Sequence, residues 1–171
     1  MKRFIFLLAA LLVSPLDCFA QKAYTRVITA SPTVDTNAYA TGELVGGKLT
    51  FTGSKAGFVV SAQITDLAAQ AVDFDVVLFD ANPSATTFTD QAAFDIADAD
   101  IPKVIGVINF PSTSRFAFAD NSVHFVGGLG IPFSGSMVSG NPTIYGALIS
   151  RGTPTFAAST DVKVKLAISQ D

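Results

Sequence analysis

The feature that most restricts the fold of this chain is an alternation of apolar and polar residues with a period of two. It is clearest over residues 162–169, which read VKVKLAIS. Successive side chains of a β-strand point to opposite faces of a sheet, so this pattern predicts a half-buried strand. Residues 57–66 and 72–78 repeat it, and the first of these segments places Phe58, Val60, Ala62 and Ile64 on one face.

Strands of this kind recur along the chain and are separated by Gly, Pro, Asn and Ser. Eight are predicted, at about 24–30, 43–52, 57–66, 72–78, 103–110, 122–133, 143–150 and 162–169. The sixth contains Gly127 and Gly128, where we expect a break. One or two helical turns are expected only within residues 89–98, which Thr89 or Asp90 could cap. Many short strands and few helices predict an all-β fold, an antiparallel sandwich or jelly-roll-like single domain.

The first twenty residues are typical of a signal peptide. Lys2 and Arg3 precede an apolar run over residues 4–13, and small residues at Cys18 and Ala20 suit cleavage before Gln21. The run is shorter than the roughly 20 residues that span a bilayer, so no stable membrane insertion is expected after cleavage. A retained anchor or a lipid-linked Cys18 is the alternative. The sequence therefore predicts a signal-peptide-like segment at 1–20, a β-sandwich domain at 21–171 and export to the periplasm or exterior.

The charge and the cysteine content of the chain indicate which partners it can bind and whether disulfide bonds can stabilise it. Without residues 1–20 the chain has 9 basic and 13 acidic residues, a balance that argues against binding to nucleic acid. Cys18 is the only cysteine and would leave with the signal segment, so packing must stabilise the rest. Thirteen of the fourteen acidic residues are Asp, which favours turns and loops over helices.

An acidic cluster is the first candidate for chemistry. It consists of Asp90, Asp95, Asp98 and Asp100. Calcium takes several carboxylate and carbonyl oxygens from one flexible loop, which makes these residues candidate ligands. The cluster lacks the glycine and the distal glutamate of the calcium-loop motif. We therefore expect a solvated loop with Asx turns and no metal, and retain calcium as the less favoured alternative.

Catalytic residues and cofactor motifs are not apparent, so the prediction is no catalytic residue, no cofactor and no enzyme. His124 is the only histidine and is interpreted as a solvated strand residue. Asp73 and Asp75 are neighbours on one strand face, and no second acid is placed opposite them as glycoside cleavage requires. The glycine-rich segments at 45–47 and 126–130 lack phosphate-binding spacing and are interpreted as bulges or turns.

Several longer motifs suggest a family. Residues 26–53 read RVITASPTVDTNAYATGELVGGKLTFTG, and similar motifs continue in VLFDANPSATTFTDQAAFDIADADIPKVIGVINF, FADNSV, LGIPF and the final IYGALISRGTPTFAASTDVKVKLAISQD. The chain resembles small β-sandwich virion structural proteins, of capsid-decoration type, from tailed bacteriophages and prophages. This resemblance implies a non-enzymatic particle component that binds itself or other virion proteins and resides in the virion if phage-encoded. The signal-like segment departs from that pattern.

Two functions therefore remain open. One is a structural or interaction module of virion type, and the other is an exported binding module for a carbohydrate or cell-surface polymer. Sugar-binding platforms use Trp or Tyr, whereas this chain has no Trp and three Tyr, which favours the structural reading.

Self-association is expected from the strands themselves. Residues 58–65 and 145–150 carry no charge, and uncharged sheet edges invite pairing with another chain. Lys163 and Lys165 would protect the last strand if it were an edge. These features predict a homo-oligomer or lattice-bound subunit. The alternative is that the uncharged strands are central and covered within one chain.

Overall fold

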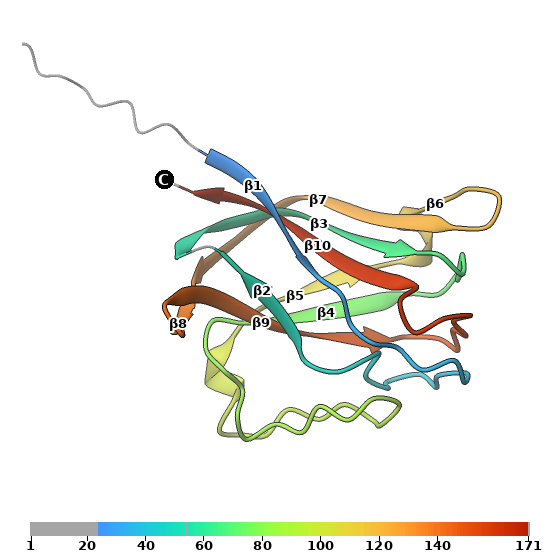
Figure 1. Ribbon diagram of the computed structural model, residues 1–171, viewed down its shortest axis with the longest axis horizontal. Coiled ribbons are helices and arrows are strands. Elements are labelled where there is room, and N and C mark those ends of the chain that lie inside the picture. Colours follow the sequence, from blue (N-terminus) through green and yellow to red (C-terminus); the bar gives the residue numbers. More distant parts are fainter. Residues whose placement is uncertain (1–23, 54, 171) are drawn as a thin grey trace, which may run out of the picture.

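The computed structural model describes residues 24–53 and 55–170, which form two antiparallel β-sheets (Figure 1). Sheet one has the strand order β1-β10-β3-β7-β6, and sheet two has the order β2-β9-β4-β5, with β8 paired to β9. The strands are β1 (Tyr24–Ala30), β2 (Leu49–Thr52), β3 (Ala56–Asp66), β4 (Phe74–Phe79), β5 (Val104–Phe110), β6 (Arg115–Ala117), β7 (Ser122–Ser134), β8 (Ser136–Val138), β9 (Asn141–Ser150) and β10 (Val162–Gln170).

The all-β prediction is confirmed, with ten strands in the described part of the chain. The two that the sequence did not predict are β6 and β8, which have three residues each. The prediction of a signal peptide at 1–20 lies outside the described residues. The main core fills the space between the sheets and draws Ile64 and Leu166 from sheet one and Phe51, Phe74 and Leu148 from sheet two.

Strand β3 contains a β-bulge that changes which residues are buried. Val59 pairs with Ile168 of β10, and Ser61 pairs with the preceding residue Ala167, so Val60 is an extra residue in the ladder. The extra residue reverses the alternation, because side chains on the two sides of a bulge fall out of phase. Val59 is therefore buried, whereas Phe58 is 49% exposed. The prediction that Phe58 shares the buried face of Ile64 is wrong.

Strand β7 runs through the glycines where a break was expected. Ile131 pairs with Val59 and Gly127 with Ser61, so residues 128–130 lie opposite the single residue Val60. Gly128 has a φ of 70°, a conformation that glycine adopts without steric cost. The glycines therefore allow β7 to bulge together with β3, and the strand continues.

Two further local predictions are wrong. The expected strand at 43–52 is regular only over β2, and Glu43 and Leu44 form isolated bridges to Ala93 and Ile149. No helix forms within 89–98; the described helices are two short 3₁₀ turns, η1 (Ile101–Lys103) and η2 (Ser112–Ser114). The reason at 89–98 is that Asp90 accepts hydrogen bonds from main-chain N–H groups, an alternative to helical pairing.

Sheet two is covered on its outer side by the chain itself. Residues 80–103, which we call the covering loop, pass below this sheet in Figure 1. The loop places Phe88, Phe94 and Ile96 against a second apolar cluster. The buried members of that cluster are Leu44, Val77, Phe79, Tyr145, Ala147 and Ile149. Strand β4 is consequently buried on both faces.

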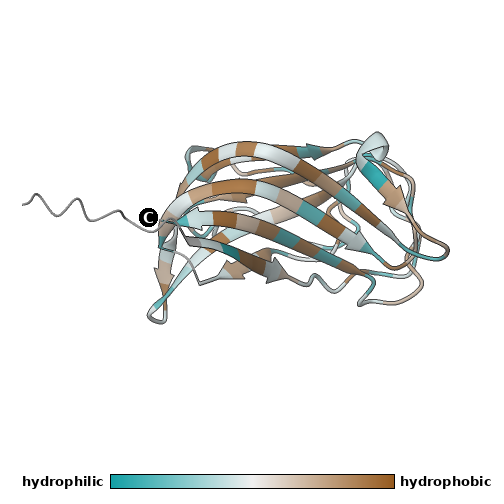
Figure 2. Ribbon diagram, turned by 90° about the horizontal axis from the view of Figure 1, so that it is seen from above, coloured by the Kyte–Doolittle hydropathy of each residue, from teal (hydrophilic) through white to brown (hydrophobic). Residues whose placement is uncertain are grey.

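The outer side of sheet one has no such cover. Figure 2 looks onto this sheet and shows hydrophobic and hydrophilic residues alternating along its strands. We call this surface the open face. Its outward residues are Thr25, Val27 and Thr29 of β1; Lys163, Lys165, Ala167 and Ser169 of β10; Phe58, Ser61, Gln63 and Thr65 of β3; Val123, Phe125 and Gly127 of β7; and Phe116 of β6.

The uncharged segments are central strands. Residues 58–65 belong to β3, which lies between β10 and β7, and residues 145–150 belong to β9, which lies between β2 and β4. Strand β10 is also central, so Lys163 and Lys165 do not protect an edge. The edge argument for self-association therefore does not hold, and any case for an oligomer must rest on the faces of the sandwich.

Candidate functional site

Asp100 holds the covering loop in place. Its carboxylate is buried and accepts hydrogen bonds from the Ala85 and Thr86 amides, at 2.9 and 2.7 Å, and from the Thr86 hydroxyl at 2.8 Å. Its other oxygen accepts from Lys103 Nζ at 2.7 Å. The Lys103 ammonium and the Thr86 donors lower the pKa of Asp100 to about 2, although burial opposes the shift. This carboxylate is thus occupied by structural contacts.

Asp90 connects the covering loop to the segment before β2. It accepts hydrogen bonds from the Tyr39 hydroxyl at 2.8 Å and from the Gly46 amide at 2.7 Å. Burial raises the pKa of Tyr39, and Asp90 adds to the effect because a nearby carboxylate disfavours the phenolate. Tyr39 therefore stays protonated and able to donate.

The four acidic residues do not come together. Asp95 and Asp98 are exposed, and the described residues offer them no ion-pair partner. No group of three or more His, Cys, Asp or Glu in the described ranges could hold a metal ion. The structure thus separates the cluster into two structural carboxylates, Asp90 and Asp100, and two that face solvent.

Removing the Asp100 carboxylate should release the covering loop. In Asp100→Ala, the Ala85 and Thr86 donors lose a buried acceptor and Lys103 loses its partner, which is unfavourable for buried polar groups. We expect faster amide exchange and proteolysis within 81–100, with the central strands still protected. The matched control is Asp98→Ala, which alters an exposed residue of the same loop. Equal exchange in the two variants would contradict this role for Asp100.

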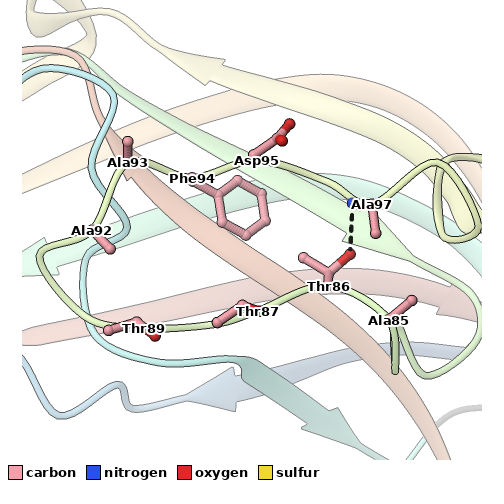
Figure 3. Close-up of a pocket in the computed structure, with 9 residues that line it drawn as sticks. All are labelled: Ala85, Thr86, Thr87, Thr89, Ala92, Ala93, Phe94, Asp95 and Ala97. Carbon is pink, nitrogen blue, oxygen red and sulfur yellow. Dashed lines mark hydrogen bonds between the residues drawn. The ribbon is translucent and has the colours of Figure 1, made fainter.

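A pocket of about 260 Å³ lies within the covering loop (Figure 3). Thr86, Thr87, Phe94 and Asp95 line it together with small alanines. The Thr86 hydroxyl accepts a hydrogen bond from the Ala97 amide, so this wall is fixed by the loop's own contacts. The polar groups that line the pocket belong to the loop itself, and the Thr86 hydroxyl is already engaged within it. We therefore assign no ligand to this pocket.

His124 is buried, which corrects the prediction of a solvated histidine. It faces the core from β7, and its ring lies edge-on to the Phe74 ring with centroids 5.5 Å apart. Neither ring nitrogen forms a hydrogen bond with the described residues. Burial lowers the pKa of His124; Arg115 contributes, whereas the nearby main chain of Gln70 and the Asp73 carboxylate oppose the shift. The predicted alternation correctly placed Phe125 on the opposite strand face from His124, but it did not show which of the two faces is buried.

This burial makes stability depend on pH. Because the folded-state pKa of His124 lies below its usual value of 6.5, the unfolded chain takes up the proton first. The contribution of His124 to the free energy of unfolding should therefore be constant above neutrality and fall as pH drops through 6.5 toward the folded-state pKa. We expect His124→Leu to remove this part of the pH dependence and to be as stable as the parent at neutral pH, since two unpaired nitrogens are lost. Urea unfolding of both proteins across this range measures it; parallel pH curves would count against the assignment.

Asp73 and Asp75 are engaged in separate structural contacts. Asp75 forms an ion pair with Arg151 at 2.7 Å and accepts a hydrogen bond from the Asn109 side chain at 2.8 Å. Asp73 accepts a hydrogen bond from the Ser112 amide at 2.6 Å, which lowers its pKa. These contacts hold the ends of β4, β5 and β9 together.

The open face contains a hollow of about 350 Å³. It is lined by Val27, Ser61, Ala62, Gln63, Phe125, Lys165 and Ala167. The outward lining residues belong to two neighbouring rows of paired residues: the first contains Lys165, Gln63 and Phe125, and the second contains Val27, Ala167, Ser61 and Gly127. Small side chains in the middle of the second row leave space, and a Cβ on Gly127 would lie 3.2 Å from the Phe125 ring. Phe125 thus leans over the glycine and borders the hollow.

The sequence contained part of the signal for this surface. The alternation over residues 162–169 already placed Lys163 and Lys165 opposite the buried face. What it did not contain is the order of the strands, which brings Val27, Ser61 and Phe125 beside Lys165 from distant segments. The open face is the strongest candidate for a functional surface.

Comparison of the chain with protein-family models, curated proteins and solved structures finds no match. Neither described helix has the length and hydrophobicity that a membrane-spanning helix needs.

Proposed function

We propose that this protein is a non-enzymatic structural or interaction module of virion-surface type, which attaches to a particle through its open face. One observation carries the proposal. The outer side of sheet two is covered by residues 80–103 except at its edge strand β5, where Val107 is exposed, whereas the outer side of sheet one exposes Val27, Phe58, Phe116 and Phe125. Large apolar side chains gathered on one uncovered surface are typical of a site that binds a partner.

The strand order gives further support. When the two three-residue strands are left aside, the remaining eight pair as first with last, second with seventh, third with sixth and fourth with fifth. This is the pattern of a long hairpin wound into two sheets, and we interpret it as a jelly roll. Viral capsid and lectin domains use that fold, a likeness that bears on architecture and only weakly on function.

Particle attachment is tested by co-sedimentation with purified phage particles from a bacterium that encodes the chain. Val27→Ser with Phe125→Ser should weaken binding at least about tenfold, because burial of each apolar side chain contributes about 1.5–3 kcal/mol. Met137→Ser, which alters an exposed apolar residue of β8, is the matched control. If the unmodified protein stays in the supernatant and is missing from native particles, the proposal fails.

A second candidate is an exported module that binds a carbohydrate. The hollow on the open face favours it, because Gln63, Ser61 and Lys165 line it together with Phe125. A ring beside hydrogen-bonding groups suits a hydroxylated ligand. Retarded migration in gels containing neutral or acidic polysaccharide, lost in Gln63→Ala, would support it. Unchanged migration in all of them would remove it.

A further inference from the structure

Two opposite surfaces of the sandwich carry unpaired charge of opposite sign. On the open face, Lys163 and Lys165 project from β10, and neither ammonium forms an ion pair with a described residue. None of the outward residues of sheet one is acidic. The open face is therefore basic although the chain as a whole has a net charge of −3.

The covering loop forms the opposite surface and is acidic. Asp95 and Asp98 are exposed on it. The one basic residue of the loop, Lys103, donates to Asp100 and to the Asn82 carbonyl. Lys48, an exposed residue just before β2, lies against the loop at Asn82 and Phe88, and neither lysine forms an ion pair with Asp95 or Asp98. Ile101, which begins η1 at the end of the same loop, is 52% exposed. Each surface thus combines two like charges with apolar exposure, from several side chains on the open face and from Ile101 on the covering loop.

We propose that copies of this chain dock head to tail, with the open face of one copy against the covering loop of the next. The proposal rests on the proposed function and names a second copy as the partner of the open face. Lys163 and Lys165 would face Asp95 and Asp98, and Ile101 would approach the apolar border formed by Val27 and Phe125. Opposite charges steer such an encounter and fix its register.

Pairing of two open faces with each other is disfavoured. It would place lysines against lysines with no acid on either side, and like charges across an interface are costly. A head-to-tail contact uses two different surfaces, so a pair of docked copies still offers one free open face and one free covering loop, to which further copies can add. Because the open face and the covering loop lie at the top and bottom of the sandwich in Figure 1, successive copies add along the direction that crosses both sheets.

The first test is sedimentation velocity of the unmodified protein over a range of concentrations. We expect the average mass to rise with concentration beyond that of a dimer. Raising salt from about 50 to about 500 mM should weaken the association several-fold, because salt screens exposed charges. A constant monomeric mass at tens of micromolar protein in low salt would overturn the proposal.

Charge reversal tests the contact itself. The first variant carries Lys163→Glu and Lys165→Glu, and the second carries Asp95→Lys and Asp98→Lys. Each alone should remain monomeric, because its two docking surfaces then have the same sign. An equal mixture should associate again and grow beyond a dimer. Lys55→Glu, which alters an exposed lysine outside both surfaces, should associate like the parent.

The outcomes separate this proposal from particle attachment. Growth that stops at a dimer in the mixture indicates that two open faces meet, and association that ignores every reversal places the contact elsewhere; either result overturns the head-to-tail contact. A protein that is monomeric but co-sediments with particles refutes the head-to-tail contact and leaves particle attachment standing. A monomer that also fails to co-sediment refutes both. Circular dichroism of each variant verifies that the fold is retained.

Discussion

Phe74→Ala is expected to lower the free energy of unfolding by about 3–5 kcal/mol, the usual cost of removing a buried aromatic side chain. Phe74 is 1% exposed and belongs to β4, which lies between β5 and β9 and is buried on both faces. Its ring fills the space between the sheets and contacts the His124 ring edge-on. Alanine would leave a cavity there, because neighbouring central strands have little freedom to close it.

Urea unfolding followed by circular dichroism measures this loss. Phe118→Ala is the matched control, because Phe118 is 62% exposed and lies outside both apolar clusters. Its effect should stay within about 0.5 kcal/mol. Similar losses in the two variants would mean that β4 does not lie at the centre of the core.

The sequence was sufficient to predict where most of the strands lie, and its signal is clearest where apolar and polar residues alternate with a period of two. Apolar residues alternate with polar or small residues without interruption over residues 162–169, and the side chains of β10 alternate in the same way between buried and more exposed positions. The period carries no information about which strands are neighbours. That is why the uncharged residues of β3 and β9 gave an argument for exposed edges, although both strands are central.

A β-bulge and a buried polar residue account for two further differences between the predicted and the observed structure. One extra residue at Val60 reverses the face of Phe58, and hydropathy along the strand does not reveal it. His124 is polar by composition, yet it lies on the inward side of β7 in phase with Ser122. Sequence reasoning favours solvent for an isolated histidine, and only the packing of the two sheets places it against Phe74.

The candidate surface could be predicted even less. Its charge arises because five strands from separate parts of the chain turn only neutral and basic residues outward, while two exposed acids, Asp95 and Asp98, lie in the covering loop. The net charge of the chain sums over both surfaces and does not show that they carry opposite charge. A chain that is acidic overall therefore has one basic face, which the total of acidic and basic residues conceals.

Gly57→Ala should be the second strongly destabilising change. Gly57 has a φ of 151°, a region that L-residues rarely adopt, and this strain alone costs about 1–3 kcal/mol. A Cβ at this position would lie 2.1 Å from the carbonyl oxygen of Ser169 in β10. The main chain has to move to relieve that contact, because the obstructing atom is itself part of a strand.

The end of β10 is where this movement should appear. Phe58 pairs with Ser169, so amide exchange at these two residues should accelerate in Gly57→Ala, together with a loss of at least about 1 kcal/mol in urea unfolding. Gly130→Ala in β7 is the matched control, since no atom lies within 4 Å of its added Cβ and its φ is not positive. At such a site alanine is neutral or stabilises by about 0.4–1 kcal/mol, because it restricts the unfolded chain. If Gly57→Ala were as stable as Gly130→Ala, the close approach of β3 and β10 at this position would be disproved, and the last residues of β10 would have to lie farther from β3.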